Sequence, residues 1–185
     1  NKSDHQDNEG TDRLQITLPY NQEDIILALA EVAKNLVVVN ISGSPVAMPW
    51  ADSADAIVQG WYGGTESGNA LADVLTGKVN PSGRLPFSVP FRYEDGPIKT
   101  EAQYPGVKAE GDQFWQTHYS EGVYVGYRWY ATQEIPVQFP FGHGLSYTTF
   151  EYGNAKSARS SMKSGEKLVV AVDVTNTGDV DGAEV

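Results

Sequence analysis

Leu36-Val37-Val38-Val39-Asn40-Ile41 is the stretch that decides the fold class, because it is a short continuous run of mostly β-branched residues. Such a run is typical of a strand buried on both faces of a parallel sheet. A helix is expected before it, with Asn21 as N-cap and Asp24 reaching back from the third helical position. Apolar residues then recur at helical spacing: Ile25, Ile26, Leu29, Val32 and Ala33. A helix followed by a buried strand predicts an α/β fold.

The same order of elements repeats downstream. Residues 56–61 predict a second strand, and residues 66–76 predict a helix that ends at Gly77. After a turn at 80–83, a short strand is expected over 85–89.

The second half of the chain changes character. Residues 90–116 are rich in Pro, Gly and charge and predict a long loop, which in a compact domain is usually functional or covers a neighbour. The aromatic segment 122–130 favours an edge strand or a β-bridge. Leu168, Val170, Val172 and Val174 share one face of an antiparallel, sandwich-type strand, and a further strand is expected before it.

Composition excludes several classes of partner. The net charge of -11 and the pI near 4.6 argue against nucleic acid and anionic membranes, which need a basic surface. Without cysteine the chain has no disulfide framework and no thiolate metal site. No apolar run reaches the roughly 20 residues of a membrane span. The 185 residues suffice for one core, or one core and the start of another.

Five ordered motifs resemble glycoside hydrolase family 3. They are Glu9-Gly10-Thr11-Asp12-Arg13, Ser44-Pro45-Val46-Ala47-Met48-Pro49-Trp50, Gly63-Gly64-Thr65-Glu66-Ser67-Gly68, Asn80-Pro81-Ser82-Gly83-Arg84-Leu85-Pro86 and Pro140-Phe141-Gly142-His143-Gly144-Leu145-Ser146-Tyr147-Thr148-Thr149-Phe150. The resemblance implies a three-layer α/β sandwich with a mostly parallel sheet over residues 1–148. Residues 149–185 would then form the first strands of a truncated, all-β immunoglobulin/fibronectin type III-like sandwich.

The resemblance also implies an activity. Members of this family are retaining β-glycosidases that hydrolyse terminal β-linked glucosides or related sugars, so an oligosaccharide or β-glucoside is the expected substrate and β-glucosidase the expected activity. The aspartate nucleophile would lie on an N-terminal (β/α) barrel outside this chain, which alone would be inactive. No cofactor and no metal are expected, and a periplasmic or secreted location is favoured.

Glu9 is the residue that the resemblance assigns as the catalytic acid/base. Retaining hydrolysis uses two carboxyl groups about 5 Å apart, one as nucleophile and one as acid and then base. Glu9 would need a raised pKa, to which nearby carboxylates such as Asp12 contribute, while Arg13 is expected to pair with Asp12 and fix the loop. Without the resemblance, a solvated acidic loop is the simpler interpretation. A metal site formed by Asp4, His5, Asp7 and Glu9 is a less specific alternative.

Two further residues are candidates for binding substrate or supporting a loop. Glu121 is a rival acid for which a structural role or a position at the edge of the cleft is expected. Trp115, in the long loop, offers an aromatic face on which a sugar ring could stack.

Two other functions remain open from the sequence. One is a non-catalytic carbohydrate-binding or scaffolding module. The other is a flavodoxin-like nucleotide binder, which rests on the alternation of helices and strands alone. The glycine-rich segment 63–68 could bind an anion at a helix N-terminus, but a simple turn is favoured because the Gly-Lys-Ser/Thr ending of a phosphate-binding loop is missing.

Overall fold

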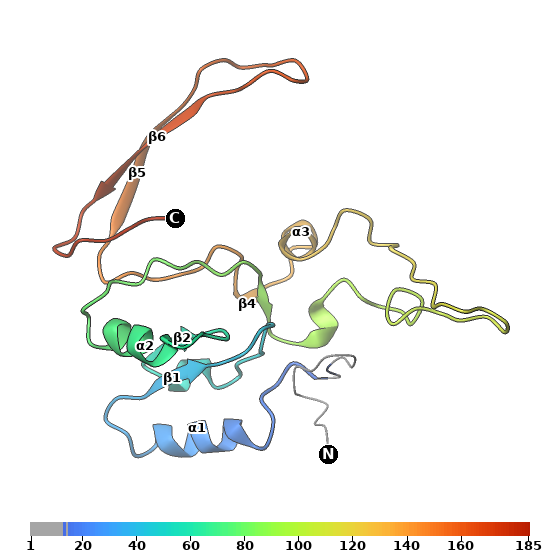
Figure 1. The fold of residues 1–185 in the computed structure, drawn as a ribbon, viewed down its shortest axis with the longest axis horizontal. Coiled ribbons are helices and arrows are strands. Elements are labelled where there is room, and N and C mark those ends of the chain that lie inside the picture. Colours follow the sequence, from blue (N-terminus) through green and yellow to red (C-terminus); the bar gives the residue numbers. More distant parts are fainter. Residues whose placement is uncertain (1–12, 14) are drawn as a thin grey trace. The chain divides into compact units, whose positions relative to one another are not determined.

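The computed structural model describes residue 13 and residues 15–185, which divide into two compact units. Of the described residues, the first unit comprises 13, 15–65 and 85–143, and the second comprises 66–84 and 144–185. Figure 1 shows the elements of both. The first unit contains α1 (Gln22–Ala30), β1 (Val37–Asn40), η1 (Ala51–Ser53), β2 (Ala56–Gln59), β3 (Val89–Pro90), η2 (Tyr93–Asp95), α3 (Tyr127–Thr132) and β4 (Val137–Phe139). The second contains α2 (Ser67–Leu75), β5 (Phe150–Ser157) and β6 (Val170–Asn176).

The predicted parallel pairing is confirmed in the first unit. β1 and β2 run parallel, with Val37 opposite Ala56 and Asn40 opposite Gln59. Complete burial of β1 was a wrong expectation, because Val37 is exposed and only Asn40 is fully buried. Among the described residues β1 pairs with β2 alone, so one edge of β1 has no strand beside it. The three-layer sandwich remains a prediction, and the α/β character is observed.

The predicted helix before β1 is present as α1, but its predicted cap is not. Asn21 adopts a left-handed conformation with φ 56° and makes no side-chain cap hydrogen bond. The carboxylate of Glu23 instead accepts a hydrogen bond from the Leu18 amide at 3.3 Å. Of the expected apolar face, only Ile26 is fully buried, since the helix packs on the narrow β1–β2 pair (Figure 1).

The core of the first unit forms around the second family-like motif. Trp50, only 1% exposed, clusters with Ile26, Val46 and Met48. Val38 and Ile57 pack against this cluster from β1 and β2. The motif therefore joins helix and sheet into one core.

Two predictions for the first unit are corrected by the structure. The strand expected over 85–89 exists only at its end, as β3, which pairs antiparallel with the unpredicted β4. The expected strand or bridge over 122–130 is instead an irregular segment followed by α3. Gly126, with φ 57°, precedes α3, and the indole of Trp129 donates to the Asp95 carbonyl at 3.0 Å. Burial of Tyr130 completes the packing that overrides local strand propensity.

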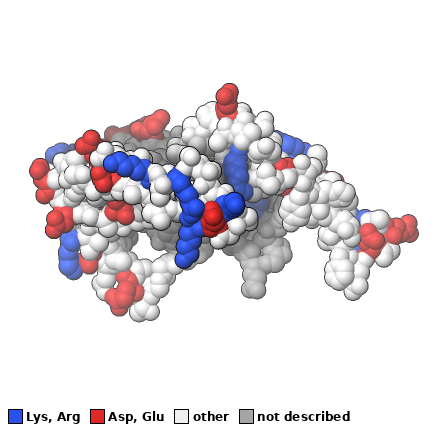
Figure 2. Space-filling view, turned by 90° about the horizontal axis from the view of Figure 1, so that it is seen from above, with Lys and Arg blue, Asp and Glu red and all other residues white. Residues whose placement is uncertain are grey.

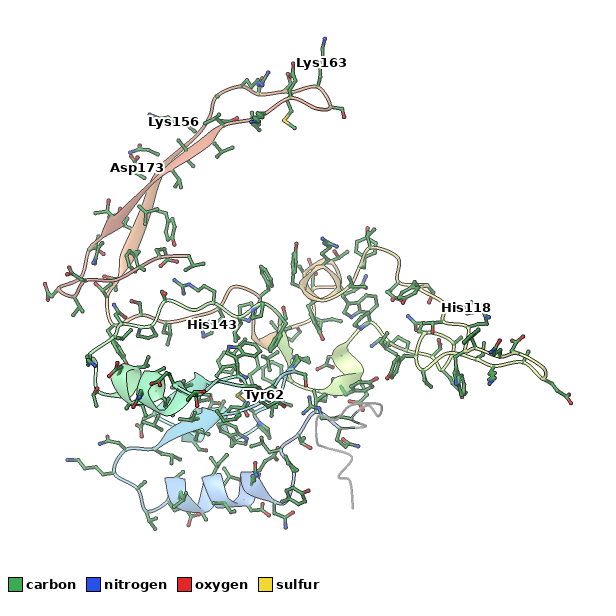
Figure 3. All side chains as sticks on the ribbon, in the orientation of Figure 1. Tyr62, His118, His143, Lys156, Lys163 and Asp173 are labelled. Atoms are coloured by element: carbon green, nitrogen blue, oxygen red, sulfur yellow. The ribbon has the colours of Figure 1, made fainter. Side chains whose placement is uncertain are left out.

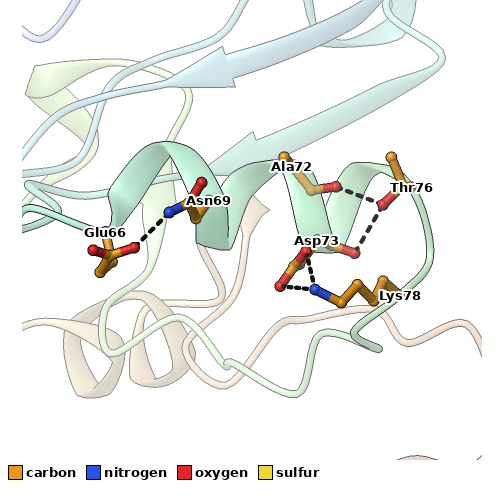
Figure 4. A network of polar contacts seen from close by, with 6 residues as sticks. All are labelled: Glu66, Asn69, Ala72, Asp73, Thr76 and Lys78. Carbon is orange, nitrogen blue, oxygen red and sulfur yellow. Dashed lines mark hydrogen bonds and ion pairs between the residues drawn. The ribbon is translucent and has the colours of Figure 1, made fainter.

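The predicted helix α2 is confirmed, and Gly77 follows it with φ 74°. Polar contacts stabilise both ends of the helix (Figure 4). Asn69 donates to Glu66 at 2.5 Å, Thr76 donates to the Ala72 carbonyl at 2.7 Å, and Lys78 pairs with Asp73 at 2.9 Å.

The predicted antiparallel strands of the second unit are also confirmed. β5 and β6 form a hairpin with Phe150 opposite Asn176, interrupted by an irregularity between Gly153 and Lys156. Lys156 and Asp173 lie along this hairpin and Lys163 lies near its tip (Figure 3). A fibronectin type III-like sandwich needs more strands than these, so it remains a prediction.

Two family-like motifs meet in the second unit through Asn80 and Arg84. The Asn80 side-chain oxygen accepts from the Ser146 hydroxyl at 3.0 Å and the Tyr147 amide at 2.8 Å, and its nitrogen donates to the Asp181 carbonyl at 3.0 Å. Arg84 donates to the Gly144 carbonyl and makes a two-pronged pair with Glu184 at 2.6 and 2.7 Å. This pairing holds the pKa of Glu184 below its usual value. These motif residues therefore connect three segments of the unit.

We expect Asn80→Ala to destabilise the second unit, because it removes three hydrogen bonds at once. Amide hydrogen exchange of β5 and β6 in the complete protein should show a local opening free energy lower by about 2 kcal/mol. The matched control is Asn69→Ala on α2, which removes a single exposed hydrogen bond and should cost about 0.5 kcal/mol or less. Equal effects of the two substitutions would contradict the role given to Asn80.

Candidate functional site

The predicted site residues fall into two groups. Glu9 and Asp12 lie outside the described residues, as do Asp4, His5 and Asp7 of the alternative metal site. The predicted pairing of Arg13 with Asp12 lies outside them for the same reason. Arg13, Trp115 and Glu121 are described.

Arg13 is attached to the loop that follows β1. Its Nη2 donates to the Ser44 hydroxyl at 2.8 Å and to the Pro45 carbonyl at 2.7 Å. These contacts join the end of the first family-like motif to the start of the second. The end of the Glu9-containing motif is thereby fixed beyond the carboxyl end of β1, the side of an open α/β sheet on which ligands bind.

A buried polar network supports the same loop. Asn40 and Ser42 are 4% and 5% exposed, and Asn40 donates to Gln59 at 2.7 Å and to Ser42 at 3.2 Å. Gln59 donates to the Ser42 carbonyl at 3.0 Å, and the Ser42 hydroxyl donates to the Ser44 carbonyl at 3.0 Å. The network ties the ends of β1 and β2 to the Arg13-binding loop.

Gly43 lets the ring of Tyr62 approach the loop after β1 closely. A Cβ at Gly43 would lie 2.7 Å from the ring of Tyr62, so a larger residue there would displace this exposed ring. Tyr62, labelled in Figure 3, belongs to the segment after β2. Sequence reasoning missed this network; the polar residues Asn40, Ser42 and Gln59 directly at two strand ends were the signal available.

Arg13 lines two grooves of the first unit. One, of about 550 Å³, is bordered by α1, β1 and Tyr62. The other, of about 570 Å³, is bordered by Ser44 and by residues of the long loop. Aromatic side chains contribute to the second groove: Phe87, Tyr93, Tyr104 and Tyr130. Flat aromatic surfaces beside a fixed arginine suit a polar ligand with apolar faces, such as a sugar ring.

Glu121 is bound to the long loop by Gln103. Gln103, 7% exposed, donates to Glu121 at 2.9 Å and to the Pro97 carbonyl at 3.1 Å, and its oxygen accepts from the Lys99 amide at 2.9 Å. The hydrogen bond from Gln103 lowers the pKa of Glu121. A general acid working near neutral pH needs a raised pKa, so this environment favours a loop-supporting role.

Trp115 lies on an arm of the long loop closed by a bridge between Val107 and Gln116. Its side chain is 58% exposed, and it contributes to neither of the two grooves that Arg13 lines. The structure thus leaves Trp115 available for contacts but does not bring it to Arg13.

The described residues give no indication of a metal site or a membrane span. No group of three His, Asp or Glu side chains among them could hold a metal ion. Within the described part of the chain, no helix is long and apolar enough to cross a bilayer. On the face shown in Figure 2, basic and acidic side chains are interspersed.

Comparison with known proteins identifies the family. The model of the glycosyl hydrolase family 3 C-terminal domain matches residues 1–147. Beta-glucosidase BoGH3A of Bacteroides ovatus is 48% identical over 100% of this chain and 24% of its own length. Beta-glucosidase B of Emericella nidulans is 48% identical over 96% of this chain and 21% of its own length.

Solved structures agree with this assignment. DesR, a beta-glucosidase from Streptomyces venezuelae solved with D-glucose, is 39% identical with a TM-score of 0.83, over 92% of this chain and 21% of that one. The GH3 beta-glucosidase of Bifidobacterium adolescentis is 40% identical with a TM-score of 0.82. The match covers 94% of this chain and 24% of that one. The chain thus spans only about a fifth to a quarter of these relatives. It belongs to glycoside hydrolase family 3, whose C-terminal domain it contains.

Proposed function

We propose that this chain supplies the acid/base half of a retaining β-glycosidase site, with Glu9 as the acid/base. The observation that carries the proposal is the attachment of Arg13, four residues after Glu9, to Ser44 and Pro45. This attachment brings the end of the motif that contains the carboxylate to the ligand-binding side of the β1–β2 pair.

The chemistry divides between two carboxyl groups. An aspartate from a barrel outside this chain attacks the anomeric carbon while Glu9 donates its proton to the leaving oxygen, which gives a covalent glycosyl-enzyme. Glu9, now ionised, then takes a proton from water as the water oxygen attacks the same carbon and releases the aspartate. Each step inverts the configuration of the anomeric carbon, so the two steps together retain it. No metal or cofactor takes part in either step.

The proposed substrates are β-glucosides or oligosaccharides with a terminal β-linked glucose. Support comes from the relatives, which are named beta-glucosidases, and from the relative solved with D-glucose. The aromatic groove beside Arg13 is the proposed place for part of the sugar. A carbohydrate-binding module without catalysis would bind such sugars and leave them intact.

We also propose a domain boundary after residue 148. The family match ends at residue 147, and β5 begins at Phe150. Residues 149–185 would then begin a fibronectin type III-like domain, of which β5 and β6 are two strands.

Hydrolysis of a β-glucoside by the complete enzyme, followed by proton NMR, tests the proposal. β-Glucose is expected as the first product, before mutarotation. First release of α-glucose would rule out the retaining mechanism, and binding without hydrolysis would favour the module. The 185 residues alone should show negligible turnover, since they supply one carboxyl group of the two. Robust retaining hydrolysis by them would disprove the half-site.

A further inference from the structure

We propose that Arg13 is a positioning residue that acts through Glu9, and that the turn of residues 42–45 is its fixed support. The inference rests on the proposed role of Glu9 and extends it to described residues. The guanidinium of Arg13 is bound by two different oxygens of this turn, at 2.8 and 2.7 Å, so both its place and its direction are restricted.

The support is held by a network of hydrogen bonds in which Asn40 and Ser42 are buried. Asn40 and Gln59 face each other across β1 and β2, and both bind Ser42. Ser42 in turn binds the Ser44 carbonyl, and the ring of Tyr62 packs on Gly43. Residues held by packing and by further hydrogen bonds keep a functional group within the narrow limits that catalysis needs.

The chain connection transmits this constraint to Glu9. Four residues of extended chain span at most about 14 Å, so a fixed Arg13 limits where the Glu9 carboxylate can go. A displacement of about 1 Å at a reacting group can cost roughly 100-fold in rate. Arg13 is therefore expected to influence proton transfer to the leaving group through the position of Glu9.

The test compares substrates with poor and good leaving groups in the complete enzyme. Arg13→Met should lower kcat/KM for cellobiose about 10- to 100-fold, and that for 2,4-dinitrophenyl β-glucoside by about 3-fold or less, because an activated leaving group needs no acid. Arg13→Lys keeps the charge but replaces the planar guanidinium with a flexible ammonium, so kcat/KM for cellobiose should fall by an intermediate factor. Ser44→Ala should also lower kcat/KM for cellobiose, by a smaller factor than Arg13→Met does.

Matched controls are exposed residues that do not belong to this turn. Arg159→Met, in an ion pair with Glu166 on the second unit, and Ser53→Ala, at the end of η1, should leave both kcat/KM values unchanged. Circular dichroism of each variant confirms that it is folded. If Arg13→Met lowers kcat/KM for both substrates equally, the positioning role is wrong.

A double-mutant cycle separates this inference from the proposed function. If Arg13 acts only through Glu9, Arg13→Met should cause no further loss on cellobiose in a Glu9→Ala background. Losses that multiply would overturn the positioning role and leave Glu9 as acid/base. If Glu9→Ala alone keeps wild-type kcat/KM on cellobiose, the proposed function itself fails.

Discussion

Glu9→Ala in the complete enzyme is expected to lower kcat/KM for cellobiose by about 10²- to 10⁴-fold, the usual contribution of a positioned general acid. The value for 2,4-dinitrophenyl β-glucoside should change far less, since its leaving group departs as a stable anion. Turnover of that activated substrate should still slow, because the glycosyl-enzyme then lacks the base that activates water. Steady-state kinetics on the two substrates measure both effects.

Glu121→Ala is the matched control for this prediction. Its carboxylate accepts a hydrogen bond from Gln103, which lowers its pKa and keeps it ionised near neutral pH. An ionised carboxylate has no proton to donate to a leaving group. Glu121→Ala should therefore change kcat/KM for both substrates by the same factor. If the loss of kcat/KM depended on the leaving group in Glu121→Ala and not in Glu9→Ala, Glu121 would be the acid/base in place of Glu9.

Trp50→Ala is expected to cause the largest loss of stability. Trp50 is 1% exposed and is the largest side chain of the core cluster with Ile26, Val46 and Met48. Its truncation should cost about 3–5 kcal/mol, as for other buried aromatic residues replaced by alanine. Calorimetry of the complete enzyme should show an earlier unfolding transition.

Trp50→Phe is the control for that substitution. The indole nitrogen of Trp50 is buried without a hydrogen-bond partner among the described residues, so phenylalanine removes a donor that gains nothing there. Most of the apolar contact is kept, and the loss should be about 1.5 kcal/mol or less. Equal losses for Trp50→Ala and Trp50→Phe would contradict the apolar contact of the ring as the source of this stability.

Much of the fold was predictable where local pattern and packing agree. The apolar run at 36–41 and the segment 56–61 both gave strands, and the alternating valines of β6 gave an antiparallel strand. Helix α2 ended before Gly77, as its left-handed φ of 74° requires.

The misses occur where distant contacts decide. The aromatic segment before α3 has strand propensity, but the Trp129 bond to Asp95 and the burial of Tyr130 favour a helix. β4 is a short strand defined by pairing with β3, far away in sequence. Asn21 took a left-handed conformation and left the predicted cap unmade.

The site was predictable only in part for the same reason. The motif and the family resemblance selected Glu9 and Arg13, which lie four residues apart in sequence. Which oxygens Arg13 would bind, 31 and 32 residues away, had no local signal. The lowered pKa of Glu121 also depends on a distant residue, Gln103.

Azide trapping with Glu9→Ala tests the central claim most directly. With 2,4-dinitrophenyl β-glucoside, added azide should restore turnover and give β-glucosyl azide, because the anion attacks the glycosyl-enzyme without needing a base. The product is identified by NMR of its anomeric proton. Formation of α-glucosyl azide, or no effect of azide on a variant that retains wild-type turnover of cellobiose, would contradict Glu9 as the acid/base.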